Sequence, residues 1–91
     1  MILPSANRVA EPEITDMLPA GISLHTTRIK LAGTSAEELL ASAEKVEEAA
    51  GLLADNGPDL IAFHCTAVST YDADLEGSLK RRIAQAAGRP A

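Results

Sequence analysis

Short apolar runs alternate with helical stripes along the 91-residue chain. Three runs predict β-strands: residues 1–3, residues 22–29, which are rich in β-branched side chains and are expected to run from a strand into a loop, and residues 60–63. The last run is apolar at every position, which is typical of a parallel strand covered on both faces. A polar segment follows each run, so each strand is expected to end in a loop.

Between and after these runs, apolar residues recur three and four positions apart, the spacing of a helix with one buried face. The first helix is expected to begin near residues 10–12 and to end before Pro-Ala-Gly at residues 19–21. The second follows two overlapping S/T-x-x-E capping boxes in residues 34–38, and it ends at Asn-Gly-Pro, residues 56–58. Its stripe is unbroken, so it predicts a single helix. The three stripes are Ala10, Ile14 and Met17; Leu39, Ala43, Val46, Ala50 and Leu53; and Leu75, Leu79, Ile83 and Ala86.

This alternation predicts one α/β lobe over residues 1–91, a flavodoxin-like three-layer sandwich in which helices flank a parallel sheet. The polar segments after the strands, residues 4–7, 26–28 and 65–69, are then expected to meet at the carboxyl edge of the sheet, where such folds bind ligands. The sequence holds no G-x-G-x-x-G or Walker loop, which argues against a nucleotide enzyme.

The amino-acid composition argues against several classes of function. A net charge of −5 argues against a nucleic-acid surface, and the basic run at residues 80–82 is better explained as the end of a helix. No apolar run is long enough to span a membrane, and the first residues do not resemble a signal peptide. One cysteine rules out an internal disulfide, supplies too few ligands for a recognisable zinc site and fits a cytoplasmic location.

Cys65, the only cysteine, is the second residue after the third apolar run. Free backbone N–H groups at the end of a strand favour an anion, so Cys65 is a candidate nucleophile. The alternative is a buried cysteine that serves as a small hydrophobic residue. His64 is a weak candidate for its base, because neighbouring residues of a strand point to opposite faces.

Four polar side chains near the same edge each have two possible roles, one in binding and one in structure. Asn7 either binds a carboxylate through its side-chain amide or stabilises its own turn by a hydrogen bond to the nearby backbone. Arg28 is either a carboxylate clamp or one half of a surface ion pair. Thr66 and Ser69 either supply hydroxyl donors or begin a helix.

Three segments together resemble the maleate cis-trans isomerase family, which is similar to arylmalonate decarboxylases and lies within the aspartate/glutamate racemase superfamily. Residues 3–13 resemble its P-S-x-N opening, residues 24–29 its second strand, and residues 54–69 the approach to its first catalytic cysteine. The resemblance covers essentially the whole chain. It implies two similar α/β lobes that face each other across a cleft, with residues 1–91 as the N-terminal lobe.

By position, the resemblance makes Cys65 the nucleophile of an isomerase. Its thiolate would add to the double bond of a cis-enedicarboxylate such as maleate, and the intermediate would rotate and release the trans isomer. No metal or organic cofactor is implied. The implied partners are a small dicarboxylate and either a C-terminal lobe or a second chain. The implied substrate-binding residues are Asn7, Ser5, Thr66, Ser69 and Arg28.

Other functions remain open from the sequence. A racemase of the same superfamily, acting on an amino-acid or hydantoin-type substrate, would use two cysteines as acid and base. A decarboxylase of the arylmalonate type has a different residue at the position of Cys65. A non-catalytic lobe would instead bind a partner through its exposed cleft face, and its uncovered apolar surface would favour a homo-oligomer.

Overall fold

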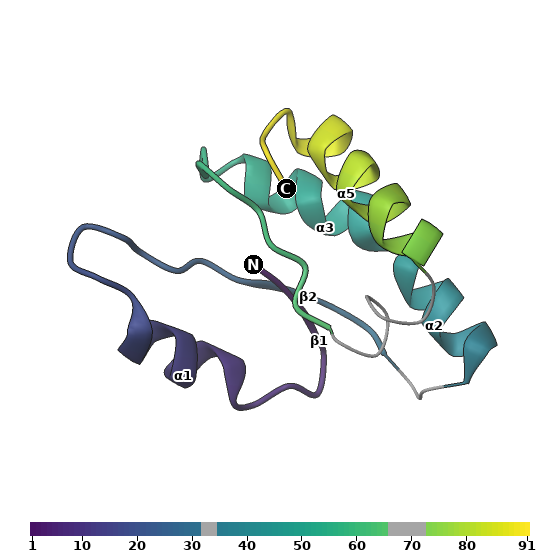
Figure 1. Cartoon of the computed structure of the whole chain (residues 1–91), viewed down its shortest axis with the longest axis horizontal. Coiled ribbons are helices and arrows are strands. Elements are labelled where there is room, and N and C mark those ends of the chain that lie inside the picture. Colours follow the sequence, from purple (N-terminus) through teal and green to yellow (C-terminus); the bar gives the residue numbers. More distant parts are fainter. Residues whose placement is uncertain (32–34, 66–72) are drawn as a thin grey trace.

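A computed structural model describes residues 1–31, 35–65 and 73–91 of the chain (Figure 1). It combines a two-stranded parallel sheet with helices, so the fold is of the predicted α/β class. The third predicted strand, residues 60–63, is not a strand in the structure and forms only a single bridge. In chain order the elements are β1 (Ile2–Pro4), α1 (Ala10–Met17), β2 (Thr27–Ile29), α2 (Ala36–Ala43), α3 (Val46–Ala54) and α5 (Ala73–Ala87).

β1 lies between two parallel neighbours. On one side it pairs with β2, with Pro4 opposite Ile29. On the other side Ile2 forms a single parallel bridge with Phe63, held by two backbone hydrogen bonds of Ile2 that are 2.8 and 2.9 Å long. Residues 60–65, here called the edge segment, therefore form an outer edge of the sheet within the described residues.

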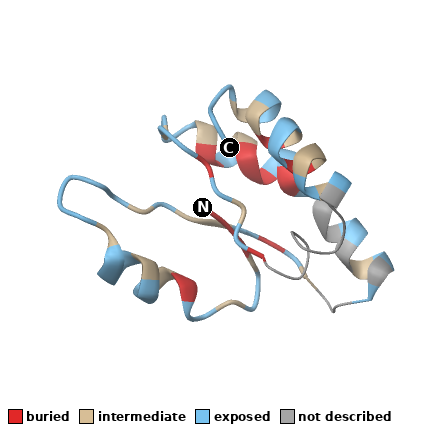
Figure 2. Ribbon diagram, in the orientation of Figure 1, coloured by how far each residue is buried: buried red, intermediate tan, exposed pale blue. Residues whose placement is uncertain are grey.

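The two faces of β1 contact different sets of apolar residues, because successive side chains of a strand point to opposite faces. Ile2 is fully buried in a larger cluster with α3 and α5, whereas Leu3 is fully buried in a smaller cluster with α1. Figure 2 shows the buried residues in β1 and along α3 and α5. The larger cluster contains Ile2, Ile29, Val46, Ala49, Ala50, Leu53, Ile61, Cys65, Leu79 and Ile83, and the smaller one contains Met1, Leu3 and Ala10.

Two of the strands differ from the prediction. Of residues 22–29, only Thr27–Ile29 forms a strand, because Thr27 lies opposite the first residue of β1 and the preceding residues extend past its end. The edge segment is covered on one face only: Ile61 is fully buried, while Leu60 is 63% exposed. The expectation that both of its faces are covered is wrong, because α3 and α5 pack on the same side of it.

The long predicted helix is two helices, α2 and α3, separated by a turn at residues 44–45. Its unbroken stripe gives no sign of this turn. After this turn α3 begins at Val46, which is the point where packing against β1, β2 and α5 begins. The predicted cap at Ser35 is confirmed, because its Oγ accepts a hydrogen bond from the N–H of Glu38 at 3.2 Å. No described helix has the length and apolar character needed to cross a membrane.

Candidate functional site

The carboxyl ends of the three parallel segments meet at one edge of the sheet, as the sequence predicts. The N–H of Ser5 donates to the carbonyl of Ile29 at 2.7 Å, and the N–H of Leu31 donates to Ser5 Oγ at 3.4 Å. Cys65 stands two residues past the bridge to β1, level with Pro4 at the end of that strand. The loop after β1 and the end of β2 therefore lie together, and Cys65 lies toward the same end of the sheet.

Cys65 is a free thiol and is only 8% exposed. Its side chain belongs to the larger cluster, on the same face of the edge segment as Ile61. His64 is exposed, which agrees with the two neighbours pointing to opposite faces, and that His64 is no base for the thiol stays a prediction. Burial of the thiol among apolar side chains is what a hydrophobic role of Cys65 predicts.

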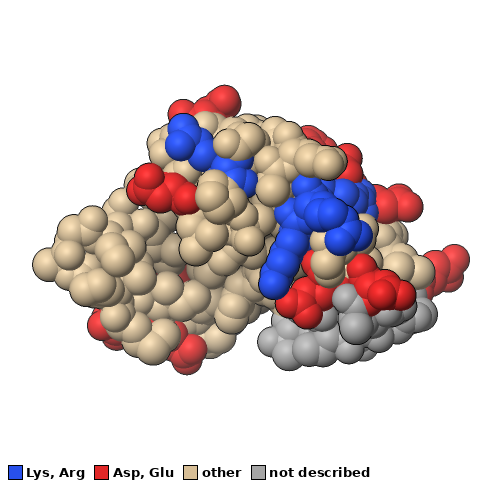
Figure 3. Space-filling model, turned by 45° about the horizontal axis from the view of Figure 1, so that its top comes forward, with Lys and Arg blue, Asp and Glu red and all other residues tan. Residues whose placement is uncertain are grey.

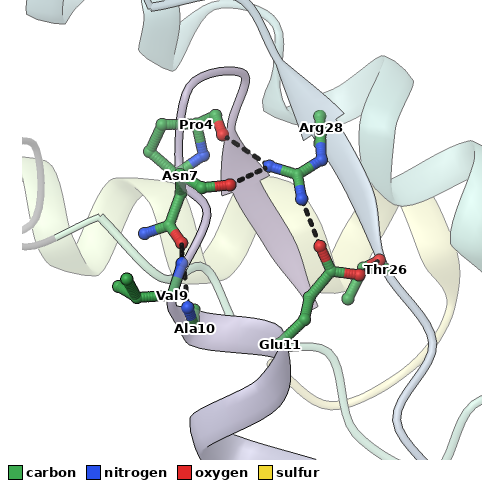
Figure 4. Close-up of polar contacts among 7 residues, drawn as sticks. All are labelled: Pro4, Asn7, Val9, Ala10, Glu11, Thr26 and Arg28. Carbon is green, nitrogen blue, oxygen red and sulfur yellow. Dashed lines mark hydrogen bonds and ion pairs between the residues drawn. The ribbon is translucent and has the colours of Figure 1, made fainter.

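Asn7 holds the start of α1. Its Oδ1 accepts hydrogen bonds from the N–H groups of Val9 at 3.1 Å and Ala10 at 3.0 Å (Figure 4). These groups have no partner inside the helix, so the side chain acts as an N-terminal cap. The amide nitrogen of Asn7 has no hydrogen-bond partner among the described residues, and Figure 4 shows it turned away from these bonds.

Replacing Asn7 with alanine is expected to lower the free energy of unfolding by about 1 kcal/mol, because the N–H groups of Val9 and Ala10 at the start of α1 lose their acceptor. Asn7→Asp keeps an acceptor oxygen next to the positive end of the helix dipole, so its stability is expected to match that of the wild type. Urea denaturation of the three proteins makes the comparison. Equal stability of the alanine and aspartate variants would contradict the capping role.

Arg28 lies inside β2, whereas the sequence predicts residues 26–28 as the loop after the second strand. The reason is the register of the sheet, which places the whole of Thr27–Ile29 opposite β1. Its Nη1 donates to the carbonyl of Pro4 at 3.1 Å and to that of Asn7 at 2.7 Å, and its Nη2 pairs with Glu11 (Figure 4). Arg28 thereby ties the loop after β1 to β2.

Glu11 completes this network and was not singled out from the sequence. One of its carboxylate oxygens pairs with Arg28, and the other accepts a hydrogen bond from Thr26 Oγ1 at 2.8 Å. Of the two readings of Arg28, the structure shows the ion pair, and a role in binding a substrate carboxylate stays a prediction. The only sequence signal for Glu11 is its acidic side chain in the first turn of a helix, because the contact with β2 depends on the tertiary fold.

Thr66 and Ser69 lie outside the described residues, so their predicted roles stay predictions. Among the residues that are described, no three His, Cys, Asp or Glu side chains converge on a point that would hold a metal ion. On the face shown in Figure 3, acidic side chains border the basic ones.

Comparisons with known proteins found no similar protein. No family model matches the chain, and the searches of curated proteins and of solved structures found no match.

Proposed function

We propose that the chain is one lobe of a cofactor-independent isomerase that converts a small cis-dicarboxylate of the maleate type to its trans isomer, with Cys65 as the nucleophile. One observation carries the proposal: the only cysteine of the chain lies at the carboxyl edge of the sheet, level with the start of the loop that holds Ser5 and Asn7. In parallel α/β sheets this edge is where ligands bind.

The proposed reaction needs only a thiolate and a place for negative charge. The sulfur of Cys65 bonds to one carbon of the double bond as the π bond breaks, and the electron pair moves onto the other carbon and its carboxylate. Rotation about the remaining single bond follows. The electron pair then returns, the carbon–sulfur bond breaks, and the trans diacid leaves with the thiolate restored.

Asn7 suits the role of carboxylate ligand in this proposal. Its oxygen is fixed by the cap of α1, and this fixes the plane of the amide. The amide nitrogen is then oriented to donate a hydrogen bond without a loss of side-chain freedom on binding. Negative charge in the intermediate would be stabilised by donors of this kind.

The arrangement of the chain as a three-layer lobe is part of the same proposal. The clusters on opposite faces of β1 support a three-layer lobe of the racemase-superfamily type. A second lobe or a second chain would supply the remaining carboxylate ligands, and the cytoplasm would be the location of the enzyme.

Acetylenedicarboxylate tests the proposal, because a thiolate adds to this alkyne diacid and the product does not eliminate. Propiolate, the corresponding monoacid, is the matched reagent, and N-acetylcysteine gives the intrinsic reactivity ratio of the two. Intact-mass spectrometry measures the rate at which each reagent labels Cys65. The ratio of the diacid rate to the monoacid rate is expected to be roughly tenfold higher for Cys65 than for N-acetylcysteine, a difference of about 1.4 kcal/mol. An equal ratio, or a thiol that neither reagent labels, would contradict the proposal.

The second candidate is a non-catalytic binding module. The burial of Cys65 at 8% exposure favours it, as does the engagement of Arg28 with Glu11. A thiol that neither alkyne acid labels is the result that this candidate predicts.

A further inference from the structure

A closed ring of polar contacts links the loop after β1 to α1 on one side and to β2 on the other (Figure 4). Arg28 of β2 donates to the backbone carbonyls of Pro4 and Asn7, at 3.1 and 2.7 Å. The side chain of Asn7 caps the start of α1, and Glu11 in the first turn of that helix pairs with Arg28 and closes the ring. Movement of the loop therefore breaks contacts on both sides.

Asn7 is held at every polar atom except its amide nitrogen. Its N–H donates to the carbonyl of Pro4 at 3.1 Å, its carbonyl accepts from Arg28, and its Oδ1 accepts from the first N–H groups of α1. Because the backbone and the amide oxygen are both held, the direction of the amide nitrogen depends on Arg28 as well as on the helix cap.

Glu11 in turn orients Arg28. One of its carboxylate oxygens pairs with Nη2 of Arg28, and the other accepts a hydrogen bond from Thr26 Oγ1 at 2.8 Å, so the carboxylate is held by two donors. The guanidinium group is planar and rigid, so a carboxylate that holds Nη2 also sets the direction of Nη1, which reaches the two loop carbonyls. The position of the loop therefore depends on Glu11 as well.

The pair of Glu11 with Arg28 is expected to affect the geometry of the loop more than the stability of the fold. The two side chains are 41% and 37% exposed, and an exposed ion pair contributes little to the free energy of unfolding. A hydrogen bond between two charged groups is nevertheless stronger than one to a neutral carbonyl, so it limits the directions that the guanidinium takes. A variant without the pair is expected to fold and to have a freer loop.

We propose that Glu11 is a positioning residue of the candidate site. Through Arg28 it fixes the loop that holds Ser5 and Asn7, and so it keeps the Asn7 amide in one orientation toward a ligand carboxylate. The role toward a ligand rests on the proposed function, whereas the hold on the loop does not.

Glu13 provides the matched control. It lies in the first turn of α1 like Glu11, so alanine at either position changes the charge near the helix N-terminus equally. Unlike Glu11 it is exposed, and its side chain has no polar partner among the described residues.

Nitrogen relaxation of the 91-residue chain measures the hold on the loop through the order parameter of the Asn7 side-chain amide. The expected value is about 0.85, that of a rigid group, in the wild type and in Glu13→Ala. In Glu11→Ala it is expected to fall below about 0.6, the range of flexible groups. The melting temperatures of both variants are expected to stay close to that of the wild type, because both carboxylates are largely exposed to water.

Arg28→Lys tests the route from Glu11 to the loop. Lysine keeps the positive charge but lacks the rigid fork, so it is unable to hold the carboxylate and both carbonyls in the same geometry. The order parameter of the Asn7 amide is expected to fall as it does in Glu11→Ala.

The labelling of Cys65 tests whether the fixed amide serves a ligand. The ratio of the acetylenedicarboxylate rate to the propiolate rate is expected to fall roughly fivefold in Glu11→Ala, because a freed amide must be ordered again when a carboxylate binds. Glu13→Ala is expected to keep the wild-type ratio. In an Asn7→Ala background, Glu11→Ala is expected to cause no further fall, because a residue that acts through the Asn7 amide has no effect once the amide is removed.

Equal order parameters in Glu11→Ala and Glu13→Ala would overturn the hold of Glu11 on the loop, and a rigid amide in Arg28→Lys would overturn the route through Arg28. A further fivefold fall in the Asn7→Ala background would overturn the action through the Asn7 amide. A wild type that labels at the ratio of N-acetylcysteine contradicts the proposed function instead, and the order parameters then decide the role of Glu11 by themselves.

Discussion

The Ile2→Ala variant is expected to lose about 3–4 kcal/mol of unfolding free energy, out of the roughly 5–15 kcal/mol that holds a typical domain together. Ile2 is fully buried in the larger cluster. It also lies in the central strand, where it pairs with β2 and bridges to the edge segment. Alanine keeps the backbone bonds but leaves a cavity between the sheet and the helices α3 and α5.

Ile22→Ala is the matched control, because it makes the same substitution at a residue that is 57% exposed. Its expected loss is below about 0.5 kcal/mol. Thermal denaturation should then show the melting temperature of Ile2→Ala lower by roughly 15–25 °C and that of Ile22→Ala nearly unchanged. Similar losses in the two variants would contradict a core centred on β1.

The first two strands and the helical segments were predictable in order, because they follow from local signals, whereas the third predicted strand forms only a bridge and the second predicted helix is two helices. Apolar runs, helical spacing and caps each depend on a few neighbouring residues, and the end of α3 illustrates this: Gly57, with a φ of +62°, follows the helix where Asn-Gly-Pro predicts its end. The length of β2 was not predictable in this way. The start of β2 depends on where β1 begins, because Thr27 pairs with Ile2. These two residues are 25 positions apart in the sequence, so no local signal marks the start of β2.

The candidate site was predictable as a place but not as a set of contacts. The carboxyl edge follows from parallel topology, so Ser5, Asn7 and Cys65 were expected there. The pairing of Arg28 with Glu11 depends on how α1 folds back beside β2, and residue spacing does not encode it. The burial of Cys65 likewise depends on α3 and α5 packing on one face of the edge segment.

Cys65→Ala is expected to abolish the isomerisation of maleate in the proposed enzyme, because it removes the thiol that forms the covalent intermediate, and the 91 residues hold no other. Alanine is small and apolar, so it keeps the larger cluster filled except for the volume of one sulfur atom. Loss of activity with retained folding would therefore report chemistry rather than unfolding. Circular dichroism and the melting temperature check that the variant folds.

His64→Ala is the matched control for this experiment. His64 is the neighbour of Cys65, and its side chain is exposed on the opposite face of the edge segment. Its removal is expected to leave the isomerisation unchanged, because the side chain does not reach the thiol. Equal loss in both variants would point to damage of the edge segment rather than to the absence of a nucleophile.

Proton NMR of maleate incubated with the proposed enzyme, the chain together with its second lobe or second chain, tests the role of Cys65 most directly, because maleate and fumarate give separate olefinic signals. The predicted result is fumarate formed by the wild type and by His64→Ala, and none formed by Cys65→Ala. Fumarate formed equally by Cys65→Ala, or maleate left unchanged by the wild type, would contradict the assignment of Cys65 as the nucleophile.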